Sequence, residues 1–158
     1  MNNKLGINRE YDLKEIEYYL FNIKYHLIDE NFNFNLNSIF SIEYLEKLHS
    51  FLFEDVYDSD YCKLRKDITE EGIKDVNNLL NHAQLLMNEY DANTFSEIIY
   101  KIWENQLFYD GNTRTLLCFV KVVSNIYNLD IKYDFEKNID KDYFINEIVD
   151  AISHEKRI

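Results

Sequence analysis

Apolar residues recur at spacings of three and four along most of the chain, which is the period of an amphipathic helix. The clearest run is Leu13, Ile16, Leu20, Ile23 and Leu27. Five further stretches have the same period, over residues 42–52, 73–87, 95–102, 116–123 and 144–152. We therefore expect six helices joined by short connections, which pack as one compact domain over residues 1–158.

Helix starts are marked by side chains that accept hydrogen bonds from free backbone N–H groups. Four such side chains stand before apolar stripes: Asp12, Ser41, Thr69 and Thr94. Asp12 and Thr94 are each followed three residues later by a glutamate, which predicts a capping box at the first and the fourth helix. The sixth helix is expected from about Asp140, and residues 31–37 are expected to form an irregular connection or a short extended piece.

The composition supports a helical protein. The chain of 158 residues contains 3 glycines and no proline. Collagen-like chains, Pro-rich linkers and β-proteins dense in turns all need these residues, so the expected fold class is all-α. Cys62 and Cys118 have neither the number nor the spacing of a disulfide framework or a zinc site.

Charge narrows the choice of partners. Subtracting 29 Asp and Glu from 17 Lys and Arg gives a net charge of −12. Nucleic acids and anionic membranes attract basic surfaces, so neither is an expected partner. No apolar run is long enough to cross a membrane and the N-terminus carries no secretion signal pattern, so we expect a cytoplasmic protein. The 13 Tyr and 11 Phe could serve a protein interface or a homo-oligomer, although an AT-rich genome would give the same excess.

The stretch Gln106-Leu-Phe-Tyr-Asp-Gly-Asn-Thr-Arg-Thr115 lies between two strongly apolar segments. Gly111 allows an unusual backbone conformation, and Asn112 and Thr113 can begin a helix whose free N–H groups attract phosphate. Arg114 adds a planar fork of donors for phosphate oxygens, and Asp110 is a carboxylate suited to Mg²⁺. The same residues are also typical of a plain turn and helix cap, with a solvated arginine.

This stretch resembles the signature of the Fic family, His-Pro-Phe-x-x-Gly-Asn-Gly-Arg. The matching residues are Phe108, Asp110, Gly111, Asn112, Arg114 and Thr115. Further segments similar to Fic domains occur in the family's order, at residues 3–7, 48–57, 63–68 and 138–143. Fic domains are compact helical bundles, so the resemblance implies the same fold class as the periodicity.

The resemblance also implies an activity, the transfer of AMP from ATP to a hydroxyl of a target protein; some relatives transfer other phosphate-bearing groups. It implies Asp110 as the ligand of Mg²⁺. It implies the segment Gly111, Asn112, Thr113 and Arg114 as the cradle of the ATP phosphates, with Phe108 as an anchor into the core. The implied partners are a target protein or another Fic-family protein.

Three departures from the family pattern affect this activity. Gln106 occupies the position of the catalytic histidine, and a carboxamide cannot accept a proton near neutral pH. Loss of a positioned base costs on the order of a hundred- to ten-thousand-fold in rate. Leu117 stands where many members have a second arginine. Asp58-Ser-Asp-Tyr61 replaces a Trp-Ala-Gly turn, so at most a short, reduced flap is expected before the third helix.

Two functions remain open at this point. The first is a pseudoenzyme or regulatory module that binds a nucleotide or a protein, and the absence of the base favours it. The second is an active or weakly active transferase. The four histidines, His26, His49, His82 and His154, have no metal-binding spacing and are expected at the surface or in packing.

Overall fold

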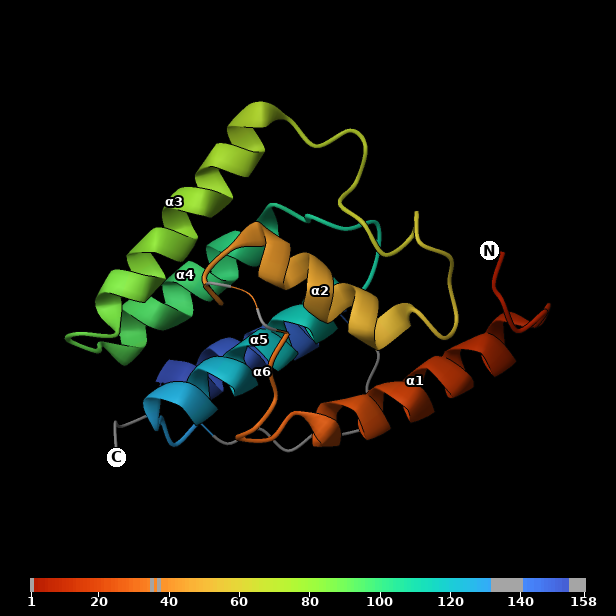
Figure 1. Cartoon of the computed structure of the whole chain (residues 1–158), viewed down its shortest axis with the longest axis horizontal. Helices are drawn as coiled ribbons and strands as arrows, with labels where there is room; N and C mark the ends of the chain where they lie inside the picture. Colours follow the sequence, from red (N-terminus) through yellow and green to blue (C-terminus); the bar gives the residue numbers. More distant parts are fainter. Residues whose placement is uncertain (1, 35, 37, 132–140, 154–158) are drawn as a thin grey trace.

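A computed structural model of the protein describes residues 2–34, 36, 38–131 and 141–153, with residues 141–144 described by their backbone only. Within these residues the chain forms six α-helices and no β-strand (Figure 1). The helices are α1 Glu10–Leu27, α2 Ile42–Phe53, α3 Glu70–Leu86, α4 Ala92–Glu104, α5 Asn112–Tyr127 and α6 Lys141–Ser153. The predicted all-α bundle is confirmed.

Helix α5 lies at the centre of the bundle. It packs against α2, α4 and α6, whereas α1 packs on α2 and α3 packs on α4 at opposite sides of the molecule (Figure 1). The sequence of α5 explains this position, because its buried residues lie all around the helix, as expected for a helix without a solvent face. Helix α5 is therefore held in place by three neighbouring helices.

Two of the predicted caps are present. The Oγ of Ser41 accepts a hydrogen bond from the backbone N–H of Tyr44, and the Oγ1 of Thr69 accepts one from the N–H of Gly72. These bonds satisfy donors that have no partner within the first turn of a helix. The starts of α2 and α3 are thus where the sequence places them.

The two predicted capping boxes are wrong. Helix α1 begins at Glu10 after an extended Arg9, so Asp12 lies in its first turn. Helix α4 begins at Ala92 after an extended Asp91, and the hydroxyl of Thr94, now inside the helix, donates to the Asp91 carboxylate. Both helices start three residues earlier than predicted, because a polar residue ahead of an apolar stripe is as acceptable in a first turn as at a cap.

The ends of other elements agree with the sequence where they are described. Residues 31–34, 36 and 38 form neither helix nor strand, in line with the expected irregular connection. Helix α6 begins at Lys141, and Ile148 and Ile152 of its predicted stripe are buried. Asp140 and the side chain of Phe144, which belong to the same prediction, lie outside the described residues. No described helix combines the length and the apolar character needed to cross a membrane.

Residues 54–69, between α2 and α3, form a series of turns rather than a hairpin, as the expected reduced flap requires. This segment lies against the connection between α4 and α5. The backbone N–H of Arg65 donates to the carbonyl of Leu107 at 2.9 Å, and the N–H of Lys66 donates to the hydroxyl of Tyr109 at 3.0 Å. The flap segment and the motif loop therefore support each other.

Candidate anion and metal site

The motif loop comprises residues 105–111, between the end of α4 and the start of α5. Leu107 and Phe108 point into the core and are 3% and 2% exposed, so Phe108 is buried as the resemblance implies. Asn112 and Thr113 already belong to α5. The expectation that these two residues start a helix is confirmed.

Gln106 has a left-handed backbone conformation, with a φ of 45°. Its side chain is bound on both sides: Nε2 donates to the carbonyl of Trp103 at 2.7 Å, and Oε1 accepts from Nδ2 of Asn112 at 3.1 Å. A positive φ is uncommon outside glycine and marks a strained position. The residue at the place of the family's histidine thus joins the end of α4 to the start of α5.

The side chain of Asn112 is buried and makes three hydrogen bonds within the loop. Its Oδ1 accepts from the N–H of Phe108 at 3.0 Å, and its Nδ2 donates to the carbonyl of Phe108 at 2.9 Å as well as to Gln106. These bonds use both amide hydrogens and one lone pair of the oxygen. The side chain therefore shapes the loop, and any contact of Asn112 with phosphate would use its backbone N–H.

Gly111 is the N-cap of α5 and has a φ of 80°. A Cβ at this position would lie 2.4 Å from Cε2 and 2.5 Å from Cζ of Phe53, and 3.2 Å from Nε2 of His49. Both the backbone conformation and the lack of space require glycine here. Phe53 and His49 lie on α2, so this helix packs against the loop.

His49 is one of two residues of this site that sequence reasoning missed. It is fully buried, its ring stacks on Phe108 with centroids 4.0 Å apart, and its Nε2 donates to the backbone carbonyl of Asp110 at 2.8 Å. Its Nδ1 has no hydrogen-bond partner in the described part of the chain. Burial lowers the pKa of His49 to about 4, against a smaller raising effect of the bond to Asp110, so the ring is neutral at pH 7.

Arg114 lies in the first turn of α5. Its guanidinium is 4.7 Å from the centroid of the Phe53 ring, and no described carboxylate lies within ion-pair distance of it. The aromatic face holds the cation by a cation–π contact and leaves its N–H donors to other groups. Leu117, one turn further on, is 1% exposed. A buried core leucine therefore occupies the position of the family's second arginine.

Thr113 contributes to packing as well as to the helix start. Its Oγ1 accepts a hydrogen bond from Nε1 of Trp103 at 2.9 Å, which links the last turn of α4 to the first turn of α5. Trp103 therefore serves the structure of the bundle at this point. The backbone N–H groups at the start of α5, with the positive end of its dipole, remain the donors that an anion would meet.

Asp110 supplies the carboxylate of the site. Its Oδ1 accepts from the N–H of Gly111 at 2.8 Å, and its Oδ2 accepts from the hydroxyl of Tyr61 at 3.3 Å. Carboxylate oxygens are the hard donors that Mg²⁺ prefers. Among the described residues no group of three or more His, Cys, Asp or Glu side chains could cage a metal. One carboxylate beside an anion site is the donor set for Mg²⁺ that arrives with phosphates, so these residues fit that ion.

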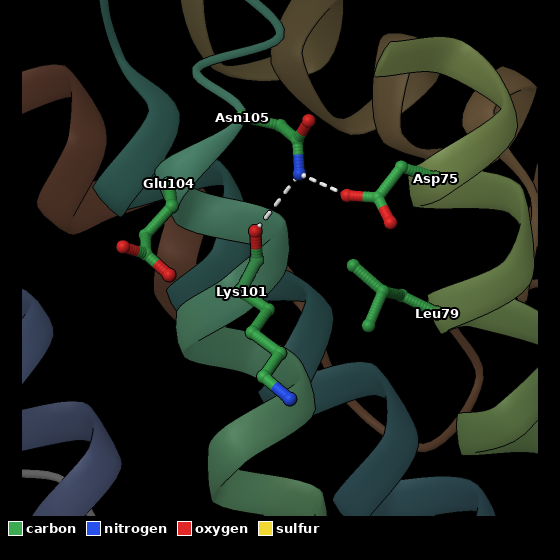
Figure 2. A pocket seen from close by; sticks show the side chains of 5 residues that line it. All are labelled: Asp75, Leu79, Lys101, Glu104 and Asn105. Carbon is green, nitrogen blue, oxygen red and sulfur yellow. Dashed lines mark hydrogen bonds between the residues drawn. The ribbon is translucent and has the colours of Figure 1, made fainter. Parts of the chain in front are cut away.

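A polar groove of about 270 Å³ borders the start of the loop, between α3 and α4 (Figure 2). Nδ2 of Asn105 donates to Oδ2 of Asp75 at 3.1 Å and to the carbonyl of Lys101 at 3.0 Å. Asn105 is the last residue before Gln106, so these bonds fix where the loop begins. The groove is lined by Lys101 and Glu104 besides Asn105, Asp75 and Leu79, and none of the predicted site residues faces it.

All the predicted site residues lie in one short segment of the chain, and the structure adds two residues from other segments. Gln106, Asp110, Gly111, Asn112, Thr113 and Arg114 lie in the loop and the first turn of α5. His49 and Tyr61 reach the loop from α2 and from the flap segment. His49 lies in the stretch 48–57, which resembles a segment of Fic domains. The helical period of this stretch does not by itself indicate that the ring contacts the loop.

Two comparisons with known proteins give a result. The sequence profile of the Fic/DOC family matches residues 39–123, which include α2, α3, α4, the motif loop and most of α5. Among solved structures, the fold is similar to that of BepC, a VirB-translocated effector protein from Bartonella tribocorum crystallised with bound AMPPNP. The TM-score is 0.74 at 14% identity, and the match covers 100% of this chain and 93% of that one. No curated protein matches the sequence significantly.

Proposed function

Because this chain belongs to the Fic/DOC family, we propose that it is a nucleotide-binding module of that family that has lost the transferase activity. The proposal has two parts, a nucleotide site that is retained and a catalytic base that is lost. Its ligand is ATP with Mg²⁺, and its role is to regulate a protein partner, either a target protein or an active Fic-family protein. Each part rests on different residues of the motif loop.

The binding part is supported by the donors at the start of α5. A helix N-terminus with free N–H groups attracts phosphate, and Arg114 lies beside it without a carboxylate partner among the described residues. Mg²⁺ would be held by Asp110 and would neutralise phosphate charge next to that carboxylate. The similar structure of BepC carries AMPPNP, which supports the choice of an adenine nucleotide.

Gln106 is the observation that carries the loss of activity. A general base must hold a lone pair within reach of the attacking hydroxyl and must accept its proton. The amide of Gln106 cannot accept a proton, and its two polar atoms are already bonded to Trp103 and Asn112. His49, whose ring contacts the loop, cannot replace it, because this ring is fully buried and its Nε2 donates to Asp110.

Binding is tested by thermal denaturation with ATP and Mg²⁺. We expect the wild-type protein to be stabilised by the nucleotide and Arg114→Ala to lose that stabilisation. Arg9→Ala is the matched control, since the side chain of Arg9 is 81% exposed at the start of α1, and it should respond as the wild type does. If wild-type protein and Arg114→Ala show no difference, the proposed phosphate site is wrong.

Catalysis is tested by incubating the protein with labelled ATP and a cell lysate. Gln106→His restores the base at a backbone position that histidine tolerates, because histidine is enriched among residues with positive φ. We expect label on a target only with Gln106→His, and none with the wild type or with Gln84→His, a control on the exposed face of α3. Equal labelling by the wild type would favour the alternative, an active transferase that works without this base.

A further inference from the structure

Tyr61 of the flap segment contacts the carboxylate of the site. Its hydroxyl donates to Oδ2 of Asp110 at 3.3 Å, across 49 positions of the sequence. It lies in Asp58-Ser-Asp-Tyr61, the turn in which this chain departs from the pattern that its sequence otherwise resembles. The resemblance therefore implies no role for the contact of Tyr61 with Asp110.

The ring of Tyr61 is held firmly by its neighbours. It stacks on Tyr57 with centroids 3.9 Å apart at 23°, and it meets Phe53 edge to face at 5.8 Å. Its backbone N–H donates to Oδ1 of Asp58 at 3.2 Å. A phenol clamped between rings has little freedom, so the direction in which its hydroxyl donates is set by packing.

The carboxylate of Asp110 is consequently held from two sides. The N–H of Gly111 donates to Oδ1 at 2.8 Å, and the Tyr61 hydroxyl donates to Oδ2. Two donors from different parts of the chain fix the rotation of the carboxylate. Hydrogen bonds of this kind, made to a metal-binding side chain by residues behind it, orient the ligand before the metal arrives.

We infer that Tyr61 is a positioning residue, which orients the Asp110 carboxylate toward a divalent cation bound with the nucleotide. The inference rests on the proposed nucleotide site, and it concerns the cation rather than the phosphates. Loss of such a hydrogen bond typically lowers metal affinity ten- to a hundred-fold. Tyr61→Phe keeps the ring and its stacking and removes only the donor, so it isolates this effect.

The experiment measures the affinity for ATP by calorimetry, once with Mn²⁺ and once with EDTA. For the wild type we expect tighter binding with Mn²⁺. For Tyr61→Phe we expect the affinity with Mn²⁺ to fall about ten-fold or more, and the affinity in EDTA to stay unchanged. A purely structural role of Tyr61 would weaken binding under both conditions, so the contrast separates positioning from general damage.

Two control variants remove a tyrosine hydroxyl elsewhere. In Tyr57→Phe the lost hydroxyl belongs to the same ring stack but is hydrogen-bonded to Glu17 rather than to Asp110. In Tyr19→Phe it lies on the exposed side of α1, where the side chain is 61% exposed. Both variants should keep the wild-type affinity for ATP with Mn²⁺.

Four results would overturn the inference. Unchanged affinity of Tyr61→Phe with Mn²⁺, an equal loss with Mn²⁺ and with EDTA, or the same loss in Tyr57→Phe would each show that the hydroxyl does not position a metal ligand. Wild-type binding that does not depend on Mn²⁺ would remove the cation and leave the nucleotide proposal standing. If the wild type binds no ATP under either condition, the proposed function itself fails.

Discussion

The imidazole of His49 donates from Nε2 to the backbone carbonyl of Asp110 at 2.8 Å, although the two residues are 61 positions apart. This bond joins α2 to the residue that precedes the N-cap of α5. Every residue has a backbone carbonyl, so the residue types of the motif do not indicate this contact. It holds the backbone at the point where Gly111 turns into the helix with a positive φ.

The free energy of unfolding should decrease as the pH falls through the range in which unfolded histidine titrates. The pKa of His49 is lowered to about 4 in the folded protein and is about 6.5 when unfolded, so the unfolded chain binds more protons between these values. The contribution of the neutral ring is complete above about pH 6.5 and is lost as the pH falls toward 4, by up to about 3 kcal/mol. Urea denaturation of the metal-free protein between pH 4.5 and 7 measures it.

The variant His49→Phe isolates this contribution. It should lose about 1–3 kcal/mol at pH 7, because the Asp110 carbonyl loses its donor, and its stability should vary less with pH than that of the wild type. His82→Gln on the exposed side of α3 is the control and should keep the wild-type profile. Equal pH profiles for His49→Phe and the wild type would contradict the assignment of the buried neutral ring.

Gly111→Ala should destabilise the protein by roughly 2–4 kcal/mol. A positive φ costs an alanine about 1–2 kcal/mol, and its Cβ would also overlap the ring of Phe53. Gly6→Ala is a matched control, because Gly6 has a φ of 68° and open space around it, so only the backbone cost of about 1–2 kcal/mol applies. Equal losses in the two variants would mean that Phe53 moves away freely. Chemical denaturation of both variants decides this.

Asn112→Asp should destabilise the loop by about 3 kcal/mol at pH 7. The amide group of Asn112 faces two acceptors, the carbonyl of Phe108 and Oε1 of Gln106, and a carboxylate cannot donate to either. Asn78→Asp on the exposed face of α3 should change stability by less than about 0.5 kcal/mol. A small effect of Asn112→Asp in urea denaturation would show that the loop does not depend on this amide.

Both cysteines should be unreactive in the native protein. Cys62 and Cys118 are buried, and burial raises the pKa of both thiols, so little thiolate is present at pH 8. We expect slow reaction with Ellman's reagent in buffer. In urea at about 8 M, which unfolds the protein, we expect rapid reaction of two thiols. Variants Cys62→Ser and Cys118→Ser, each with one remaining thiol, identify which residue reacts. Rapid modification of either thiol in buffer would disprove its protection.

The sequence by itself determined the helical period, the starts of α2 and α3 and the place of the motif loop. These features depend on neighbours within one turn, such as Ser41 with Tyr44 or Thr69 with Gly72, so a local pattern is sufficient to predict them. The predicted starts of α1 and α4 were wrong by three residues. Several polar side chains precede each stripe, and local pattern does not decide which of them becomes the cap.

Only the tertiary structure decided what surrounds the motif. The contacts of Asp110 with His49 and Tyr61, and the close approach of Phe53 to Gly111, join residues far apart in the chain. The order of residues does not state such contacts, because they depend on how α2, the flap segment and α5 pack together. Asn112 is the clearest case: its position in the motif indicates a role at phosphate, and only the packing shows the three bonds of its side chain within the loop.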